Sequence, residues 1–414
     1  MIWLFPFLAV FGLLPAVWGW RLAWYYWRNS HPARPAEGAL PKAAIILCVR
    51  GLDPSLPACL RGLLRQDYPS YELHVIIDSE NDPAWPAVHD MVRERPANVR
   101  IRVEALRDPL TTCSLKVSSQ LQALAGLSDG VEIVAFVDAD SEVQPDWLHE
   151  MSAPLADPKV GATSGIRWFA PTRNSWGDLV RHIYNAGSFT QMFVFRMPWG
   201  GALALRRETL AKADLPTTWS RSFCEDAATY GQLHPLGLKL VFVPAATQLN
   251  REAISSAGAR RFMLRQLLCV RLHHYYWRQM WFLNILNAIA LVAIAALLGV
   301  HLWLGDALWS CALGGLLGGF ILLMVGGLVA GDRLVRTNMR SRIADIPPPP
   351  MSWKILPAAI ATQSLSMRLM IETLSLPRID WRGIVYHLLP NSEIRLDKYE
   401  PFKMLLTDPN RSVV

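Results

Sequence analysis

The sequence contains little charge and lacks the glycine-rich motifs of the common nucleotide-binding folds. Charged residues make up 18% of the 414 residues and hydrophobic residues 52%, a balance that argues against an ordinary soluble protein. The six cysteines are scattered and include no CxxC pair, so they predict reduced thiols in a cytosolic compartment, with neither a disulfide framework nor a zinc site. No GxGxxG or GxxxxGK(S/T) element occurs, which argues against a dinucleotide fingerprint or a P-loop.

Three long apolar runs predict membrane-spanning helices. Residues 2–20, 281–304 and 307–331 are long enough to cross a bilayer and contain no Asp, Glu, Lys or Arg. The first run lacks the basic start and the cleavage site of a signal peptide, so we interpret it as a retained anchor. A short link containing Asp306 joins the other two into a helical hairpin. The alternative, buried helices of a soluble core, is disfavoured by the length of all three runs.

The charges beside these runs predict their orientation. Much of the net charge of +7 comes from arginines after the first run, before the second and after the third, which argues against nucleic acid as the partner. The positive-inside rule therefore places residues from about 21 to 280, and those beyond about 332, in the cytoplasm. Residues 355–376 are apolar but interrupted by Gln363, Arg368 and Glu372. This pattern favours a helix lying on the membrane, with a fourth crossing left open.

Between the anchors, short β-branched runs alternate with helical stretches. We expect strands at residues 43–49, 72–77, 99–103, 132–137 and 238–243, and helices at 56–65, 84–93, 116–125 and 145–156. This alternation is typical of βαβ units around a mostly parallel sheet, which predicts an α/β fold. In such sheets, ligands bind at the carboxyl ends of the strands.

Carboxylates follow two of the expected strands. Asp78 follows residues 72–77, and Asp138 and Asp140 follow residues 132–137. A nucleotide diphosphate requires a hard divalent cation, and hard cations prefer carboxylate oxygen, so one aspartate of the pair can face the nucleoside and the other the metal. A DxD motif alone is a weak signal, because surface loops often contain one. Its position just after an apolar strand strengthens the functional interpretation.

Three further features have both a structural and a functional interpretation. Glu225 and Asp226 begin a helical stretch, where they either offset the helix dipole or remove a proton from an acceptor hydroxyl. Lys116 is either a solvated charge or a partner for a diphosphate. Residues 198–201, which end in two glycines, form either a simple turn or a place where backbone and acceptor approach closely.

The order of these residues resembles family 2-type glycosyltransferases with the GT-A fold. More narrowly, the chain resembles ceramide glucosyltransferases and related bacterial enzymes, including hopanoid-associated ones. The resemblance extends from about residue 42 to 390 and includes a WRGxxY element near the C-terminus at residues 381–386. It implies a GT-A domain at 42–255 on the cytosolic face, an anchor at 1–28, an interfacial helix at 256–280, two spanning helices at 281–331, and an interfacial helix with a cytosolic tail at 344–414. The bacterial relatives imply an inner-membrane location.

The resemblance also implies a role for each site residue. Asp78 would contact the uracil and ribose of a UDP-sugar, and Lys116 would lie near its diphosphate. Asp138 would hold the nucleotide side, and Asp140 would bind Mn²⁺ or Mg²⁺. Asp226 would be the general base of a single displacement that inverts the anomeric carbon, with a membrane lipid as acceptor. The remaining substrate-binding residues would be Gly200, Gly201, Glu225 and Arg265.

One element departs from the family's pattern. The family carries (Q/R)xxRW on the helix that enters the membrane, whereas this chain keeps Arg265 but has Leu268 and Cys269 at the Arg-Trp positions. Either Arg261 or Arg271 compensates, the acceptor differs, or activity is weak. We expect an active enzyme with a divergent acceptor site that uses UDP-glucose, with UDP-N-acetylglucosamine as the rival donor. The alternatives are a processive polysaccharide synthase and a degenerate transferase that serves as a scaffold or nucleotide-sugar sensor.

Overall fold

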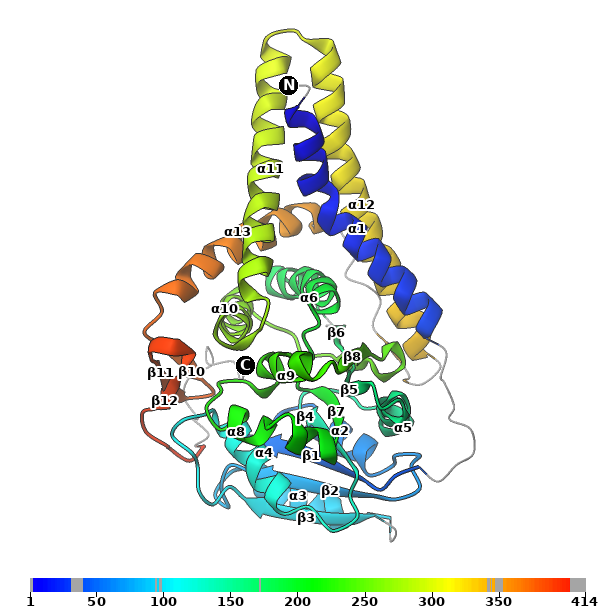
Figure 1. Cartoon of the computed structure of the whole chain (residues 1–414), viewed down its shortest axis with the longest axis vertical. Helices are drawn as coiled ribbons and strands as arrows, with labels where there is room; N and C mark the ends of the chain where they lie inside the picture. The colour runs from blue at the N-terminus through cyan, green and yellow to red at the C-terminus, as the bar shows by residue number, and fades with distance from the viewer. Residues whose placement is uncertain are drawn as a thin grey trace.

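A computed structural model shows an α/β body that carries a stalk of three long helices (Figure 1). The structure describes residues 3–30, 40–93, 95–96, 99–170, 173–340, 343, 345–346 and 353–402. Residues 403–414 of the expected C-terminal tail therefore lie outside the described residues, as do the four prolines at 347–350.

The core of the body is a seven-stranded sheet with the order β3-β2-β1-β4-β7-β5-β8. β1 pairs in parallel with β2 and β4, β2 pairs in parallel with β3, and β7 runs antiparallel between β4 and β5. The strands are β1 (Ala43–Val49), β2 (Tyr71–Ile77), β3 (Arg100–Ala105), β4 (Ile133–Asp138), β5 (Val160–Ser164), β7 (Ala202–Arg206) and β8 (Lys239–Phe242). The predicted α/β fold with a mostly parallel sheet is confirmed.

Helices cover both faces of this sheet, which is why its central strands are apolar on both sides. Ile45 and Leu47 of β1 pack with one set of helices, and Ala44 and Ile46 pack with the other set. The first set is α2 (Leu56–Leu63), α3 (Ala84–Arg93) and α5 (Trp147–Ser152). The second set is α4 (Leu115–Ala125), α8 (Leu215–Trp219) and α9 (Glu225–Leu233). The short helix α7 (Arg207–Lys212) follows β7.

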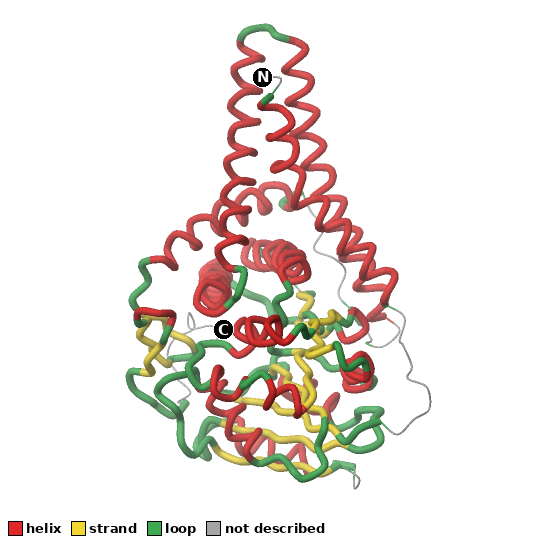
Figure 2. Tube along the Cα trace, in the orientation of Figure 1, coloured by secondary structure: helices red, strands yellow, loops and turns green. Residues whose placement is uncertain are grey.

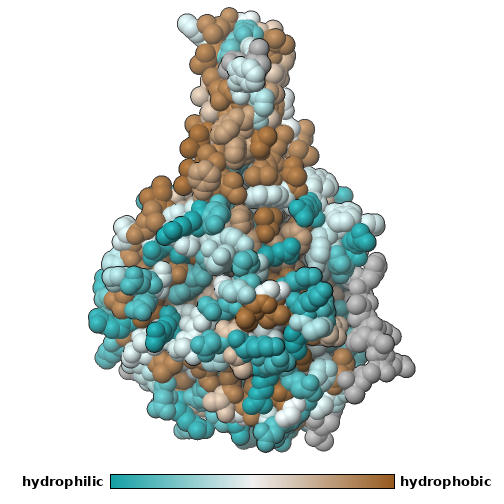
Figure 3. Space-filling model, in the orientation of Figure 1, coloured by the Kyte–Doolittle hydropathy of each residue, from teal (hydrophilic) through white to brown (hydrophobic). Residues whose placement is uncertain are grey.

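The stalk consists of α1 (Leu4–Asn29), α11 (Trp277–Trp303) and α12 (Ala307–Arg340). Among the described residues, these are the three helices long and apolar enough to cross a membrane. Figure 3 shows their brown, hydrophobic surface rising above a largely hydrophilic body. Exposed side chains such as Phe282, Val292 and Trp303 would be costly in water and are suited to lipid. The predicted membrane character is therefore supported by the packing as well as by the composition.

A layer of three helices separates the sheet from the stalk (Figure 2). It contains α6 (Trp176–Phe195), α10 (Ser256–His273) and α13 (Ile355–Leu374), and α13 packs against both α6 and α10. The sequence reasoning did not predict α6. A capping box begins it, because Ser175 accepts from the Asp178 backbone N–H and the Asp178 carboxylate accepts from the Ser175 N–H, and this was the available signal.

Two small sheets complete the body. β6 (Arg167–Phe169) pairs in parallel with β9 (Gln248–Asn250). Near the C-terminus, β10 (Arg378–Trp381), β11 (Ile384–Leu388) and β12 (Ile394–Leu396) form an antiparallel sheet. The Tyr386 hydroxyl accepts a hydrogen bond from the Leu115 N–H at 3.1 Å, which attaches this sheet to the start of α4. The WRGxxY element is therefore the β10–β11 hairpin, and it packs against the main sheet's ligand edge.

Candidate active site

The carboxyl ends of β1, β2 and β4 border a cavity of about 160 Å³. The parallel register brings them together, since Cys48 of β1 pairs with Asp138 of β4 and Val49 pairs with Ile77 of β2. The cavity contains every predicted site residue except the two glycines: Asp78, Lys116, Asp138, Asp140, Glu225, Asp226 and Arg265. The structure thus assembles the predicted set in one place, while their individual roles stay predictions.

Lys116 lies between two of the predicted carboxylates. Its Nζ is 2.8 Å from Oδ1 of Asp138 and 2.9 Å from Oε1 of Glu225, which also accepts from the Gln120 amide at 2.9 Å. Burial lowers the pKa of Lys116, but Asp138 and Glu225 outweigh it, so the net pKa is raised. Burial likewise raises the pKa of Asp138, and Lys116 and Arg167 more than reverse it. Lys116 and Asp138 therefore stay charged, and Lys116 is a fixed cation beside the DxD motif.

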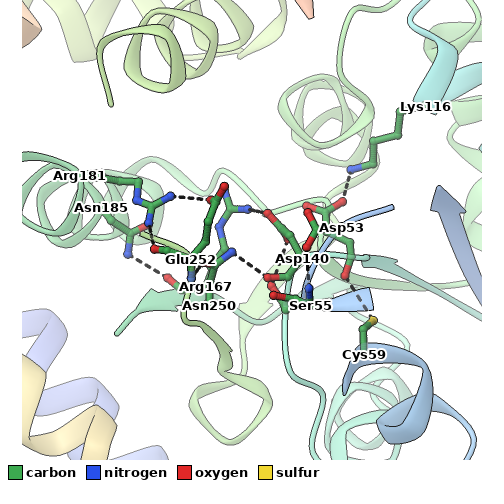
Figure 4. A network of polar contacts seen from close by, with 12 residues as sticks. Asp53, Ser55, Cys59, Lys116, Asp140, Arg167, Arg181, Asn185, Asn250 and Glu252 are labelled. Atoms are coloured by element: carbon green, nitrogen blue, oxygen red, sulfur yellow. Dashed lines mark hydrogen bonds and ion pairs between the residues drawn. The ribbon is translucent and has the colours of Figure 1, made fainter. Parts of the chain in front are cut away.

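Asp140 is paired with Arg167, a residue that the sequence reasoning missed. The guanidinium lies 2.6 Å from Oδ2 of Asp140, and the Asn250 amide donates to the Asp140 carbonyl at 2.7 Å (Figure 4). Three aromatic rings surround this guanidinium: Phe169, Trp199 and Phe262, each within 5.5 Å. No sequence motif marked Arg167, because it reaches the site from the three-residue strand β6.

Asp226 is a buried carboxylate with a pKa near neutrality. Burial raises its pKa to about 6, and the neighbouring Glu225 adds to the effect. The Gly200 N–H donates to its Oδ2 at 2.9 Å and the Ala227 N–H donates to its Oδ1 at 2.6 Å. A carboxylate with this pKa can accept a proton from a hydroxyl at neutral pH and release it again.

The two predicted glycines are close to these carboxylates for steric reasons. A Cβ added at Gly200 would overlap the Glu225 carboxylate and would lie 3.2 Å from Nζ of Lys116. A Cβ at Gly201 would overlap the Trp199 ring and would lie 2.6 Å from Oδ2 of Asp138. Glycine is therefore needed at both positions because the chain passes directly beside the charged groups.

Arg265 lines the cavity. Leu268 and Cys269, which stand where the family has Arg and Trp, lie in different surroundings. The guanidinium of Arg265 lies 5.0 Å from the Trp381 ring, and burial lowers its pKa to about 10. Leu268 is fully buried in the core, and Cys269 lines the cavity. Compensation by Arg261 or Arg271 was one of the three possibilities, and neither residue is among those that line the cavity.

Other unpredicted side chains supply charge and aromatic surface there: Arg50, Asp53, Arg167, Trp199, Glu252, Trp381 and Arg382. Two of these positions had a signal in the sequence. Arg50 follows the first strand directly, and Arg382 belongs to the WRGxxY element. The C-terminal hairpin therefore brings an arginine and a tryptophan to the same cavity as Arg265.

The carboxylates fit a divalent cation only together with a ligand. Asp138 and Asp140 offer hard oxygen donors, which Mg²⁺ and Mn²⁺ prefer. Asp53 is a neighbouring carboxylate: burial raises the pKa of Asp53, and the charge of Asp140 raises it further. Within the described part of the chain, no cluster of three or more His, Cys, Asp or Glu side chains could hold a metal alone. Water or diphosphate oxygens would complete the coordination shell.

A second cavity, of about 600 Å³, lies between this site and the stalk. Its walls come mainly from α6, α10, α11, α12 and α13, and most of its lining is apolar. Arg167, Trp199, Gln266 and Asp226 line both cavities. The buried carboxylate Asp226 therefore lies where a charged cavity meets an apolar one.

Comparisons with known proteins agree with this geometry. The chain is 33% identical over 70 residues to a ceramide glucosyltransferase of Komagataella phaffii, covering 17% of this chain and 13% of that protein. It is 41% identical over 75 residues to a ceramide glucosyltransferase of Pyricularia oryzae, covering 17% and 15%. It is also 26% identical over 152 residues to a β-monoglucosyldiacylglycerol synthase of Trichormus variabilis, covering 36% and 31%. The matches thus span less than a third of each relative's length.

Similarity to solved structures is more distant. A mannosyltransferase from Pyrobaculum calidifontis, solved with GDP-Man and Mn²⁺, aligns with 79% of this chain and 98% of its own at 19% identity and a TM-score of 0.48. Similarity at this level says nothing about the donor or the metal of the present chain.

A family model described as Glycosyl transferase family 21 matches residues 4–394, from the first helix to the last strand of the C-terminal sheet. This match covers the GT-A sheet, the carboxylate edge and the membrane helices together, and it confirms the resemblance drawn from the motifs. The chain belongs to glycosyl transferase family 21.

Proposed function

We propose that this protein transfers a hexose from a UDP-sugar, with UDP-glucose preferred, to the hydroxyl group of a membrane lipid, and inverts the anomeric carbon. The observation that carries the proposal is the position of Asp226, which lines both the charged cavity and the apolar cavity. A donor diphosphate suits the first cavity and a lipid suits the second. The relatives that make glucosylceramide or a glucosyldiacylglycerol are consistent with such an acceptor.

The residues divide the reaction between them. Asp226 removes the proton from the acceptor hydroxyl, and the oxygen attacks the anomeric carbon as the bond from that carbon to the diphosphate breaks. Lys116, Arg167 and Arg265 supply positive charge to the departing diphosphate. Asp138 would hold the nucleotide side of the donor and Asp140 would hold Mn²⁺ or Mg²⁺, which when bound would neutralise the diphosphate.

Arg167, beside the retained Arg265, takes the place of the lost Arg-Trp pair of the (Q/R)xxRW element in this proposal. Both guanidiniums are held against aromatic rings, Arg265 against Trp381 and Arg167 against Phe169 and Trp199. An arginine fixed in this way loses little conformational entropy when it contacts a phosphate. The retained carboxylates and the rebuilt cationic wall favour an active enzyme over a degenerate scaffold.

The same proposal covers domains and topology. Residues 1–28 and 281–331 span the bilayer, and the 42–255 domain lies on the cytosolic face, in a bacterial inner membrane. Residues 256–280 and 355–376 lie at the membrane surface, and the 344–414 segment stays on the cytosolic side. The arginines beside the spans support this orientation. Three spanning helices would not enclose the polymer channel of a processive synthase, so a single transfer per lipid is favoured.

A transfer assay with the purified full-length protein tests the function. Detergent-solubilised protein receives total membrane lipid, Mn²⁺ or Mg²⁺, and one radiolabelled donor at a time, either UDP-glucose or UDP-N-acetylglucosamine. We expect labelled lipid from UDP-glucose, lost on chelation and in Asp226→Asn. Asp90→Asn, which alters an exposed carboxylate on α3, is the matched control and should retain activity. Nucleotide-sugar binding without any labelled lipid would instead support the scaffold or sensor.

A further inference from the structure

The last described residues of the chain contact the predicted nucleoside-binding carboxylate. We call residues 399–402 the C-terminal strap; they follow β12 and lie beyond the region that the family model matches. The Tyr399 hydroxyl donates to the backbone carbonyl of Asp78 at 2.8 Å. The Phe402 N–H donates to Oδ2 of Asp78 at 2.9 Å. Two residues of the strap therefore hold one residue at the end of β2, more than 300 positions away in the sequence.

Arg50 connects the C-terminal strap to the carboxyl ends of the first two strands through hydrogen bonds and an ion pair. Its guanidinium pairs with Oδ2 of Asp78 at 2.5 Å and donates to the carbonyls of Arg382 at 3.2 Å and Glu400 at 3.0 Å. Arg382 returns the contact by donating to the Arg50 carbonyl at 2.7 Å. Because Arg50 directly follows β1, these bonds join the first strand, the second strand and the C-terminal segment at one point.

The strap also depends on Gly51. The Phe402 ring lies against this glycine so closely that an added Cβ would be 2.6 Å from the ring. Gly51 has φ of +76°, and its N–H donates to Oδ2 of Asp82 at 2.8 Å. Only glycine combines this backbone conformation with so near a ring, so the first strand end is shaped to receive Phe402.

These contacts leave one oxygen of Asp78 for a ligand. Asp78 is 3% exposed and lines the charged cavity. Its Oδ2 already interacts with Arg50 and the Phe402 N–H, whereas Oδ1, among the residues that the structure describes, has no hydrogen-bond partner. A buried carboxylate oxygen without a donor is costly unless a ligand supplies one.

We propose that Tyr399 and Phe402 are positioning residues for the nucleotide donor, which hold Asp78 so that Oδ1 accepts an N–H from the nucleobase. The inference rests on the proposed function, since it requires a nucleotide donor. It adds a chemical criterion for the base. Uracil presents an imide N–H to Oδ1, whereas cytosine presents a lone pair at the same ring position and repels a carboxylate. The strap therefore contributes to the selection of UDP over CDP.

Nucleotide binding to the full-length protein tests this without relying on turnover. Dissociation constants for UDP and CDP are measured by calorimetry for the wild type, Tyr399→Phe and Phe402→Ala. Lys398→Ala is the matched control, because Lys398 is exposed and pairs with the Glu400 carboxylate instead of with Asp78. The wild type and the control should prefer UDP strongly. Each strap variant should weaken UDP binding about five- to twenty-fold and reduce the preference over CDP, with donor KM rising and kcat within about twofold.

Other outcomes separate the possible failures. Unchanged UDP affinity and UDP/CDP preference in both strap variants would contradict the inference and leave the proposed function intact. Tighter UDP binding in the variants would also overturn it, because the strap would then be an occupant that competes with the donor. Absence of UDP binding by the wild type would contradict the proposed donor as well. Tyr399→Phe removes a single hydroxyl, so a folding defect in Phe402→Ala, seen as a lower Tm, would not prevent the decision.

Discussion

The guanidinium of Arg167 lies 2.6 Å from Oδ2 of Asp140, the residue expected to bind the metal. The second aspartate of the DxD motif has its own cation, since Lys116 lies 2.8 Å from Asp138. The protein thus balances both acidic charges with its own side chains. We propose that Arg167 leaves Asp140 for the diphosphate when a donor and a metal bind, since Trp199 and Phe262 would keep it within the cavity. Arg167 would then link metal binding to stabilisation of the leaving group.

This link predicts opposite effects of Arg167→Gln on metal binding and on catalysis. Without the arginine, Asp140 no longer has to exchange a cation, so the metal concentration for half-maximal activity should fall severalfold. The loss of positive charge near the diphosphate should lower kcat by about 100-fold. Activity is titrated with Mn²⁺ in the variant and in Arg207→Gln, an exposed arginine that bonds the Ser128 carbonyl. A higher metal requirement in Arg167→Gln would contradict the exchange.

The raised pKa of Asp226 predicts the acid limb of the pH profile. Burial raises this pKa to about 6, so the carboxylate is protonated below that pH and cannot take a proton from the acceptor. The value of kcat/KM should therefore fall about tenfold per pH unit below about pH 6 and level off above about pH 7. Initial rates from pH 4.5 to 8.5 measure it, with UDP binding followed in parallel. A limb near pH 4 would indicate an ordinary carboxyl in place of the buried one.

Gly200→Ala should damage the site through sterics alone. The added Cβ would overlap the Glu225 carboxylate and press on Lys116, so the Lys116–Glu225 pair would separate or the 198–201 turn would shift. We expect kcat/KM to fall at least 100-fold, with a loss of about 1–3 kcal/mol in the free energy of unfolding. Gly231→Ala is the control on α9, where the Cβ would meet only Tyr275 at 3.9 Å. Full activity in Gly200→Ala would show that the site tolerates displacement of Glu225.

Gly187 on α6 provides a test of the apolar cavity. It lines that cavity, and a Cβ added there meets nothing within 4 Å, so a side chain would extend into open space. Gly187→Leu should raise the acceptor KM about tenfold and leave UDP affinity unchanged, whereas Gly187→Ala should differ little from the wild type. Initial rates at varied lipid concentration in mixed micelles measure the effect. An unchanged acceptor KM in Gly187→Leu would place the lipid elsewhere.

The sequence predicted the elements whose signals are local. β1 and the first five residues of β4 are continuous apolar runs, and each spanning helix contains a long uncharged run. Asp78 follows β2 directly, and Asp138 ends β4. The DxD motif therefore lies at the sheet edge that borders the charged cavity. The helix α3 was predicted with the bounds that the structure has, Ala84–Arg93, because its apolar positions repeat with helical spacing.

The remaining features depend on contacts between distant segments. Arg167 reaches Asp140 only because the short β6 pairs with β9, a pairing that three residues cannot signal. The antiparallel strand β7, which follows the Gly200-Gly201 turn, was not predicted. Its pairing with β4 and β5 joins segments that are distant in the sequence. Trp381 and Arg382 approach Arg265 and Arg50 through the fold of the C-terminal sheet, so spacing along the chain could not reveal these contacts.

The central claim is that Asp226 takes the proton from a lipid hydroxyl in a single displacement. The most direct test is the anomeric configuration of the glycolipid made from UDP-α-glucose, determined by NMR of the purified product, with Asp226→Asn assayed beside the wild type. We expect a β-linked hexose from the wild type and at least a 1,000-fold lower rate in Asp226→Asn. An α-linked product, or a β-linked product formed at a normal rate by Asp226→Asn, would contradict it.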